Sequence, residues 1–151
     1  MELTYREIAT DDIPRVLEIR VSTRENKLTM EELANRWEVT PESMSKALQK
    51  DVKGWLCEDS RAAVGFSMGN KKTGEMLVVA VLPGHEGRGI GKNLMTLIQD
   101  WLWSHGHSEL WLLATPAPDI RAYGFYRTLG WRATGEIEDG HEVMKLYKNE
   151  G

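Results

Sequence analysis

The sequence predicts an α/β protein of the mixed α+β type, with a central mixed, largely antiparallel twisted sheet of about seven strands flanked by helices. Three observations lead to this prediction. The 151 residues suit a single domain spanning 1–151. Apolar residues make up 41% and charged residues 28%, which is ordinary globular composition and excludes broad disorder. Segments with the apolar spacing of strands alternate with segments that have helical spacing.

The N-terminal third begins with a short strand and continues with helices. Residues 3–8 alternate as a strand does. Two aspartates and a proline then favour a helix start, and the apolar spacing predicts a first helix over residues 12–24. A capping box predicts a short helix over 29–37, and Thr40 followed by Pro41 opens another.

The middle of the chain changes to strand periodicity. Residues 54–58 and 62–68 predict an antiparallel pair, and residues 75–82 form a nearly continuous apolar run, as expected for a strand covered on both faces. Helical spacing follows over about 89–106, and residues 109–114 predict another buried strand. This strand–helix–strand order predicts that the strands on either side of the helix are parallel.

The C-terminal part predicts one more helix and a hairpin. A helix is expected over 120–129, ended by Gly130. Strands over 131–136 and 141–147 are joined across Asp-Gly at 139–140, which is a strong hairpin signal.

Composition excludes several classes of function. With 19 basic and 23 acidic residues the net charge is −4, which gives no support for a nucleic-acid partner. No run approaches the ~20 apolar residues of a membrane span, and the charged N-terminus does not resemble a signal peptide, so we expect a cytoplasmic protein with no membrane partner. The single cysteine, Cys57, forms no internal disulfide. His105 and His107 lack further ligands at suitable spacing, so no metal is expected.

Residues 87–92, Gly-Arg-Gly-Ile-Gly-Lys, stand between a buried strand and a helix. Three alternate glycines allow the backbone to come close to a ligand. The first turn of a helix presents unpaired N–H groups and the positive end of the helix dipole. The segment therefore predicts a cradle for a phosphate or diphosphate, with Arg88 and Lys92 adding positive charge at its rim.

Two common phosphate-binding patterns do not fit this segment. A Walker loop would need glycine in place of Glu86 and serine or threonine in place of Asn93. The dinucleotide fingerprint would need its last glycine where Lys92 or Leu94 stands. The remaining structural alternative is a tight turn that binds no ligand.

Two motifs at this separation resemble the GNAT N-acetyltransferase superfamily, and the order of the elements fits over nearly the whole chain. The motifs are Val79-Ala80-Val81-Leu82-Pro83 with the glycine segment and, later, Arg121-Ala122, Phe125-Tyr126 and Leu129-Gly130-Trp131. The resemblance implies a GNAT-like acyl-CoA N-acyltransferase fold and acetyl-CoA as the acetyl donor. It places the diphosphate on the N–H groups of 87–91 and the pantetheine arm along 79–81.

The resemblance also implies a set of cofactor-binding residues. They are Val79, Ala80, Val81, Gly87, Arg88, Gly89, Ile90, Gly91, Lys92, Asp119, Ala122 and Phe125. This chain departs from the family at two positions: the family usually has arginine or glutamine where Glu86 stands, and often asparagine where Asp119 stands.

Acetyl transfer from a thioester to an amine needs a neutral amine and a leaving thiolate that becomes protonated. Glu75, at the start of the apolar strand, matches the position of a catalytic glutamate in some family members, and the alternative is a solvated strand-end residue. Tyr126 matches the family tyrosine that protonates the thiolate, and the alternative is core packing beside Phe125. A backbone N–H near Val81 would stabilise the oxyanion.

The acceptor is implied to be a primary amine of a small molecule or peptide. In the family it is bound by the segments that correspond here to 23–37 and 136–141, and neither identifies the amine. Glu86 favours a rival hypothesis, a non-catalytic CoA-sensing or interaction module with the same fold. A phosphate-nucleotide binder is a third hypothesis, and a homodimer is plausible.

Overall fold

The structure is a computed structural model, and it describes residues 3–22, 31, 35, 39–114, 121–138 and 140–148, with only the backbone described for 121–123. The strands are β1 (Leu3–Glu7), β2 (Val52–Asp59), β3 (Ala62–Asn70), β4 (Glu75–Val81), β5 (Glu109–Ala114), β6 (Arg132–Glu138) and β7 (His141–Tyr147). The helices are η1 (Thr10–Asp12), α1 (Ile13–Arg20), α3 (Pro41–Leu48), α4 (Ile90–Ser104) and α5 (Arg121–Thr128).

The described strands form one seven-stranded sheet in the order β1-β2-β3-β4-β5-β7-β6. β4 and β5 are parallel, and every other neighbouring pair is antiparallel. The predicted mixed, largely antiparallel sheet is therefore confirmed, as is the parallel arrangement of the strands that flank α4.

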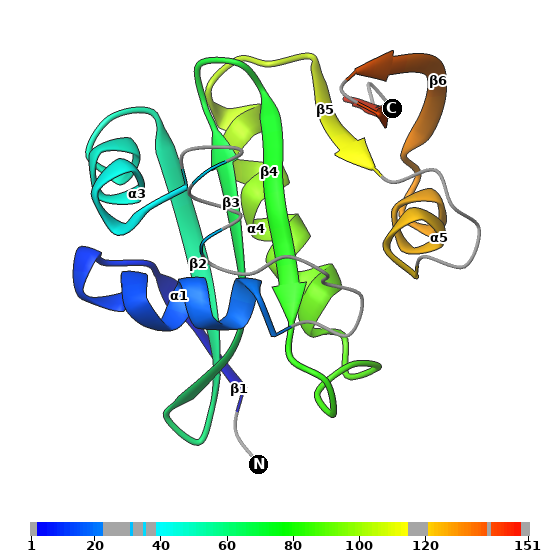
Figure 1. Cartoon of the computed structure of the whole chain (residues 1–151). Coiled ribbons are helices and arrows are strands. Elements are labelled where there is room, and N and C mark those ends of the chain that lie inside the picture. The colour runs from blue at the N-terminus through cyan, green and yellow to red at the C-terminus, as the bar shows by residue number, and fades with distance from the viewer. Residues whose placement is uncertain are drawn as a thin grey trace.

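Helices cover both faces of this sheet (Figure 1). On one face, Val16 and Ile19 of α1 pack with Phe66 and Ala80 of the central strands, and α3 packs against the same cluster. On the other face, the apolar side of α4 packs over β2, β3 and β4. Both faces of the middle of the sheet are thus covered, most completely at β3. The expectation that β4 is covered on both faces is only partly met, because Met76 and Ala80 are buried whereas Leu77 is 42% exposed.

Helix α1 ends at Arg20, four residues before the predicted end. The Ser22 hydroxyl donates to the Glu18 carbonyl at 2.6 Å, and the Ser22 N–H bonds instead to the Ile19 carbonyl at 3.0 Å. The serine side chain therefore competes for the acceptor that a continuing helix would need. Of the short helix predicted over 29–37, residues 31 and 35 are helical, and the rest lies outside the described residues.

The start of α3 is as predicted, because Thr40 caps it. The Ser43 N–H donates to the Thr40 hydroxyl at 3.1 Å, and the Thr40 N–H donates to the Ser43 hydroxyl at 2.9 Å. This reciprocal pair satisfies two N–H groups that would otherwise be unpaired at the helix start.

A two-residue turn joins β2 and β3, because Asp59 pairs with Ala62 across Ser60 and Arg61. Both turn residues have positive φ, at 53° and 76°. Such a turn matches the twist of a hairpin, but it favours asparagine and glycine over the residues present here. The turn therefore holds Asp59 at a defined place at some conformational cost.

Replacing Arg61 with glycine should relieve part of that cost. Arg61→Gly should raise the free energy of unfolding by about 0.5–1 kcal/mol, because the penalty of a side chain at positive φ exceeds the entropy that glycine adds to the unfolded chain. Urea denaturation measures the change. Lys72→Gly removes the same charge where φ is not positive, and it should bring no gain. An equal gain in both variants would contradict the strain argument.

Candidate active site

β4 and β5 separate along their length. Within the described residues they pair in register at Glu75 and Trp111, near their N-terminal ends. Figure 1 shows the two strands side by side there and apart toward their arrowheads. β4 pairs with β3 as far as Val81, whereas no described strand pairs with its other edge beyond Glu75. An extended ligand can add to this edge as a strand would.

The glycine segment follows the C-terminal end of β4 and leads into α4. Gly89 is the N-cap of α4, and both Gly87 and Gly89 have positive φ, at 80° and 79°. A Cβ atom built at either glycine would meet no atom within 4 Å. These two positions therefore face open space, and glycine is needed there for its backbone conformation.

Three N–H groups of this segment have no protein acceptor among the described residues. In the described part of the chain, those of Gly87, Gly89 and Gly91 donate to no protein atom, and the next backbone donor of the segment is Asn93, bonded to the Gly89 carbonyl at 3.0 Å. Unpaired N–H groups at a helix start fit a phosphate or diphosphate. The alternative of a closed turn is therefore not supported.

The strand residues of the predicted site have packed side chains. Val79 and Val81 lie against the cluster that holds Ile90 and Leu94, whereas Ala80 is buried in the cluster under α1. Ile90 is 1% exposed. What residues 79–81 and Ile90 can offer a ligand is therefore backbone N–H and C=O groups.

Gly91 places the loop against α5. A Cβ atom at Gly91 would lie 3.2 Å from Cζ of Phe125 and 3.8 Å from Cγ2 of Val81. The half-buried Phe125 ring thus packs close to the start of α4, as its predicted place near the cofactor requires. Asp119 and the side chain of Ala122 lie outside the described residues.

The two predicted cations of the loop have different surroundings. Lys92 is exposed. Arg88 is half-buried, and its Nη1 donates to Oδ2 of Asp59 at 2.9 Å. This ion pair reduces the positive charge that Arg88 presents to a phosphate, an effect that the sequence did not reveal.

Glu75 lies at the closed end of the gap, where β4 and β5 pair. Burial of the carboxyl, with a smaller contribution from the negative charge of Glu138, raises the pKa of Glu75 to about 7. A carboxyl with this pKa is divided between its two forms near neutral pH, which suits a general base. A fully solvated strand-end glutamate would keep its ordinary value.

Tyr126 lies in the core cluster of α4 and β5, and its ring centroid is 5.7 Å from that of Phe125 and 6.4 Å from that of Trp131. Burial raises the pKa of Tyr126 to about 12, and the positive charge of Arg20 acts in the opposite direction. The phenol is therefore protonated at neutral pH. Arg20 belongs to the end of α1, so sequence spacing gave no sign that its charge acts on Tyr126.

Comparison with known proteins decides the family. The model of the acetyltransferase (GNAT) family matches residues 14–131. The chain belongs to the GNAT family. Streptothricin acetyltransferase of Streptomyces lavendulae is 42% identical to it over 76 residues, a match that spans 49% of this chain and 38% of that protein.

Solved structures of GNAT proteins have the same fold. The PaiA N-acetyltransferase of Thermoplasma acidophilum, in complex with coenzyme A, has a TM-score of 0.83 at 17% identity, covering 98% of this chain and 100% of that one. YncA of Salmonella typhimurium, solved with its cofactor acetyl-CoA, has a TM-score of 0.75 at 16% identity, covering 100% and 96%. The predicted GNAT-like fold is thus confirmed.

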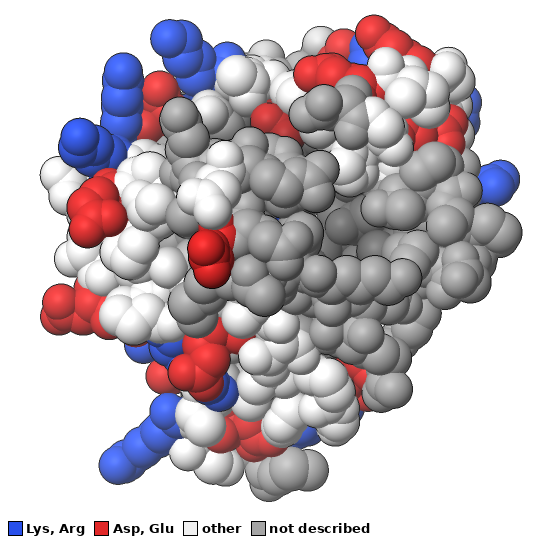
Figure 2. All heavy atoms as spheres, in the orientation of Figure 1, with Lys and Arg blue, Asp and Glu red and all other residues white. Residues whose placement is uncertain are grey.

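This GNAT chain carries acidic side chains on the strands beyond the gap. Glu136 and Glu138 lie on β6, whose side chains are exposed along its whole length, and Glu142 lies on β7. Figure 2 shows acidic side chains gathered over the β6–β7 hairpin. The described residues near the tip of this hairpin are therefore largely acidic, and β7 is the neighbour of β5 in the sheet.

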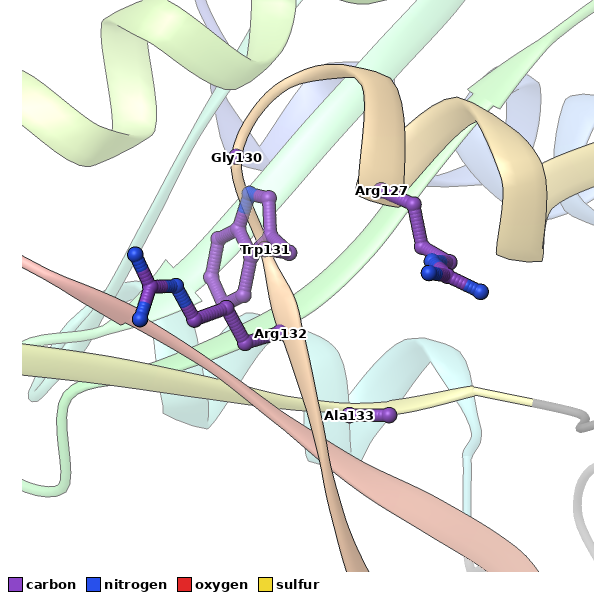
Figure 3. Close-up of a pocket in the computed structure, with 5 residues that line it drawn as sticks. All are labelled: Arg127, Gly130, Trp131, Arg132 and Ala133. Atoms are coloured by element: carbon purple, nitrogen blue, oxygen red, sulfur yellow. The ribbon is translucent and has the colours of Figure 1, made fainter.

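A pocket of about 460 Å³ lies at the turn from α5 to β6, lined by Arg127, Gly130, Trp131, Arg132 and Ala133. Figure 3 shows the side chains of Arg127 and Arg132 pointing to opposite sides of this turn, so they do not converge on one anion. None of the lining residues belongs to the glycine segment or β4. This pocket is therefore not the expected coenzyme site of the GNAT fold.

The sequence predicts neither a metal site nor a membrane span. Among the described residues, no group of three or more His, Cys, Asp or Glu side chains could hold a metal ion. The described helices include none with both the length and the apolar character of a membrane span.

Gly89→Ala should weaken the binding of coenzyme A about tenfold, because alanine at positive φ costs roughly 1–2 kcal/mol. Calorimetric titration with coenzyme A measures the change. Gly106→Ala is the matched control: it lies beyond the other end of α4, with φ of 90° and no atom within 4 Å of the added Cβ. The control should lose stability but bind normally. Equal binding by both variants would contradict a role for the Gly89 turn.

Proposed function

We propose that this protein transfers an acetyl group from acetyl-CoA to a primary amine by direct attack of the amine on the thioester. The observation that carries the proposal is the open glycine turn at the C-terminal end of β4, where β4 and β5 separate. The unpaired N–H groups suit the diphosphate, and the edge of β4 that faces β5 suits the pantetheine arm. Together they aim a thioester into the gap between the strands.

The chemistry of Glu75 and Tyr126 suits the two proton transfers. A lysine-like amine is neutral in only roughly one molecule in two thousand at pH 7, so a base helps the attack. We assign that role to Glu75, which accepts the proton lost by nitrogen, through a water relay, as the new C–N bond forms. The C–S bond then breaks, and Tyr126 gives its proton to the departing thiolate. A backbone N–H near Val81 stabilises the oxyanion that forms between the two steps.

The proton transfer from Tyr126 is uphill. Its pKa of about 12 lies above that of an ordinary thiol, near 8.5. The positive charge of Arg20 partly offsets this difference, because it stabilises the phenolate. Donation by Tyr126 therefore accompanies the breaking of the C–S bond, when negative charge gathers on sulfur.

The acceptor that fits best is a cationic amine of a small molecule or peptide. Exposed carboxylates of the β6–β7 hairpin attract such an amine, and Glu138 acts on the charge of Glu75 at the gap. The similarity to a streptothricin acetyltransferase supports a small-molecule acceptor.

One sheet joins strands from both ends of the chain, which supports a single domain over 1–151.

An acetylation screen over a panel of amines, with coenzyme A binding measured in parallel by calorimetry, tests the proposal. We expect binding of coenzyme A and acetylation of at least one cationic amine. No binding at millimolar coenzyme A would remove the proposal. Binding without consumption of the thioester by any amine would favour the rival hypothesis of a coenzyme sensor, for which Glu86 is the sequence feature.

A further inference from the structure

The β2–β3 hairpin reaches the glycine segment from a distant part of the chain. Asp59 is the last residue of β2, and the two-residue turn that follows fixes the position of its carboxylate. The side chain is 11% exposed, and the Ser60 hydroxyl donates to Oδ1 at 3.4 Å. The turn and the Ser60 hydroxyl thus restrain this carboxylate in addition to its contacts with the glycine segment.

Asp59 joins two residues of the glycine segment into one cluster. Its Oδ2 accepts from Nη1 of Arg88 at 2.9 Å and lies 3.7 Å from Nδ1 of His85. Nη1 of Arg88 lies 3.2 Å from the same Nδ1. The hydrogen bond from Arg88 lowers the pKa of Asp59, so this carboxyl is ionised at neutral pH. Asp59 thus anchors the turn around Gly87 through Arg88, whose Nη1 also contacts His85.

A second anchor holds the segment on its other side. The Asn93 amide in the first turn of α4 donates to the Tyr5 hydroxyl of β1 at 3.0 Å. Tyr5 is in turn the cross-strand neighbour of Cys57 on β2. The three glycines thus lie between two attachments to the β1–β2 edge of the sheet.

Anchoring matters here because a segment with three alternate glycines has unusual conformational freedom. A ligand that binds a mobile segment must order it, and that cost weakens binding.

We infer that Asp59 is a positioning residue of the coenzyme site, which holds Arg88 so that the glycine segment keeps the conformation that leaves its N–H groups available to a diphosphate. This inference rests on the proposed function. It assigns to the β2–β3 hairpin a part in coenzyme binding, although Asp59 itself touches no ligand.

The opposite role is physically reasonable and gives the opposite result. If Asp59 only competed with the diphosphate for Arg88, its removal would free a cation and take away a repelling anion, and binding would tighten. If Asp59 positions the loop, its removal loosens the segment, and binding weakens. The sign of the change therefore decides between the two roles.

The test compares coenzyme A binding by calorimetry in the wild-type protein, Asp59→Asn, Asp59→Glu and the control Glu58→Gln. We expect Asp59→Asn to bind about tenfold more weakly and Asp59→Glu to recover part of the loss. Glu58→Gln should bind normally, because this neighbouring carboxylate pairs with Nε of Arg6 at 3.2 Å instead of with the loop. In the acetylation assay, Asp59→Asn should raise KM for acetyl-CoA and leave kcat within about twofold.

A double-mutant cycle shows whether the effect passes through Arg88. In an Arg88→Met background, Asp59→Asn should cause little further loss of affinity. Tighter or unchanged binding by Asp59→Asn, or an undiminished loss in the Arg88→Met background, would overturn the inference while the proposed function stands. Failure of the wild-type protein to bind coenzyme A would overturn both. Asp59→Glu keeps the test informative if Asp59→Asn unfolds, because circular dichroism identifies a folded variant.

Discussion

Tyr126→Phe should lower kcat about 10²-fold while KM for acetyl-CoA stays nearly unchanged. The substitution removes only the hydroxyl that gives its proton to the thiolate. The ring remains packed between Phe125 and Trp131, with centroids 5.7 Å and 6.4 Å away. Steady-state acetylation kinetics, together with calorimetric titration of coenzyme A, separate a loss of chemistry from a loss of binding.

The control for this variant is Tyr147→Phe. Tyr147 ends β7 with 53% of its surface exposed, so loss of its hydroxyl should leave kcat unchanged. If Tyr126→Phe folds normally and keeps wild-type turnover, Tyr126 is a packing residue. The raised pKa of Tyr126 would then be a consequence of its burial in the core and would have no part in catalysis.

Local patterns account for what the sequence predicted well. The Thr40 cap and the glycine turn depend on residues close together in the chain, so short patterns identify them. The parallel pairing of β4 and β5 followed from the helix between them. The sequence predicted that α1 ends at residue 24, beyond its observed end at Arg20. The spacing of apolar residues carries no information on the hydrogen bond of the Ser22 hydroxyl.

Long-range pairs account for what the sequence could not predict. The ion pair between Asp59 and Arg88 links the β2–β3 hairpin to the glycine segment. The positive charge of Arg20 near the end of α1 lowers the pKa of Tyr126 in α5. Neither pair has a fixed sequence spacing, because the sheet brings the residues together. The roles of Glu75 and Tyr126 were implied by family resemblance, and the structure adds the burial that sets their pKa values.

Glu75→Gln should lower kcat/KM at pH 8 by about 10²-fold, because glutamine cannot take the proton from the attacking amine. In the wild-type protein, kcat/KM should rise with pH through a midpoint near the Glu75 pKa of about 7. The value of kcat/KM rises with pH because Glu75 must lose its own proton before it can accept one from the amine. The variant should lose this midpoint. Glu109→Gln, at the start of β5 and paired with Lys145, should keep it.

Although Glu75→Gln should lower activity at pH 8, it should raise the stability of the folded protein at that pH. Folding raises the pKa of Glu75 from its ordinary value near 4.5 to about 7. Between these values the unfolded chain holds fewer protons at this carboxyl than the folded protein does, so stability falls as pH rises. Glu75→Gln removes this loss and should gain on the order of 2 kcal/mol over wild type at pH 8, and little at pH 4. Urea denaturation at the two pH values measures the difference. A variant that loses both activity and stability at pH 8 would show that Glu75 is a structural residue, whereas lower activity with higher stability is what a buried base predicts.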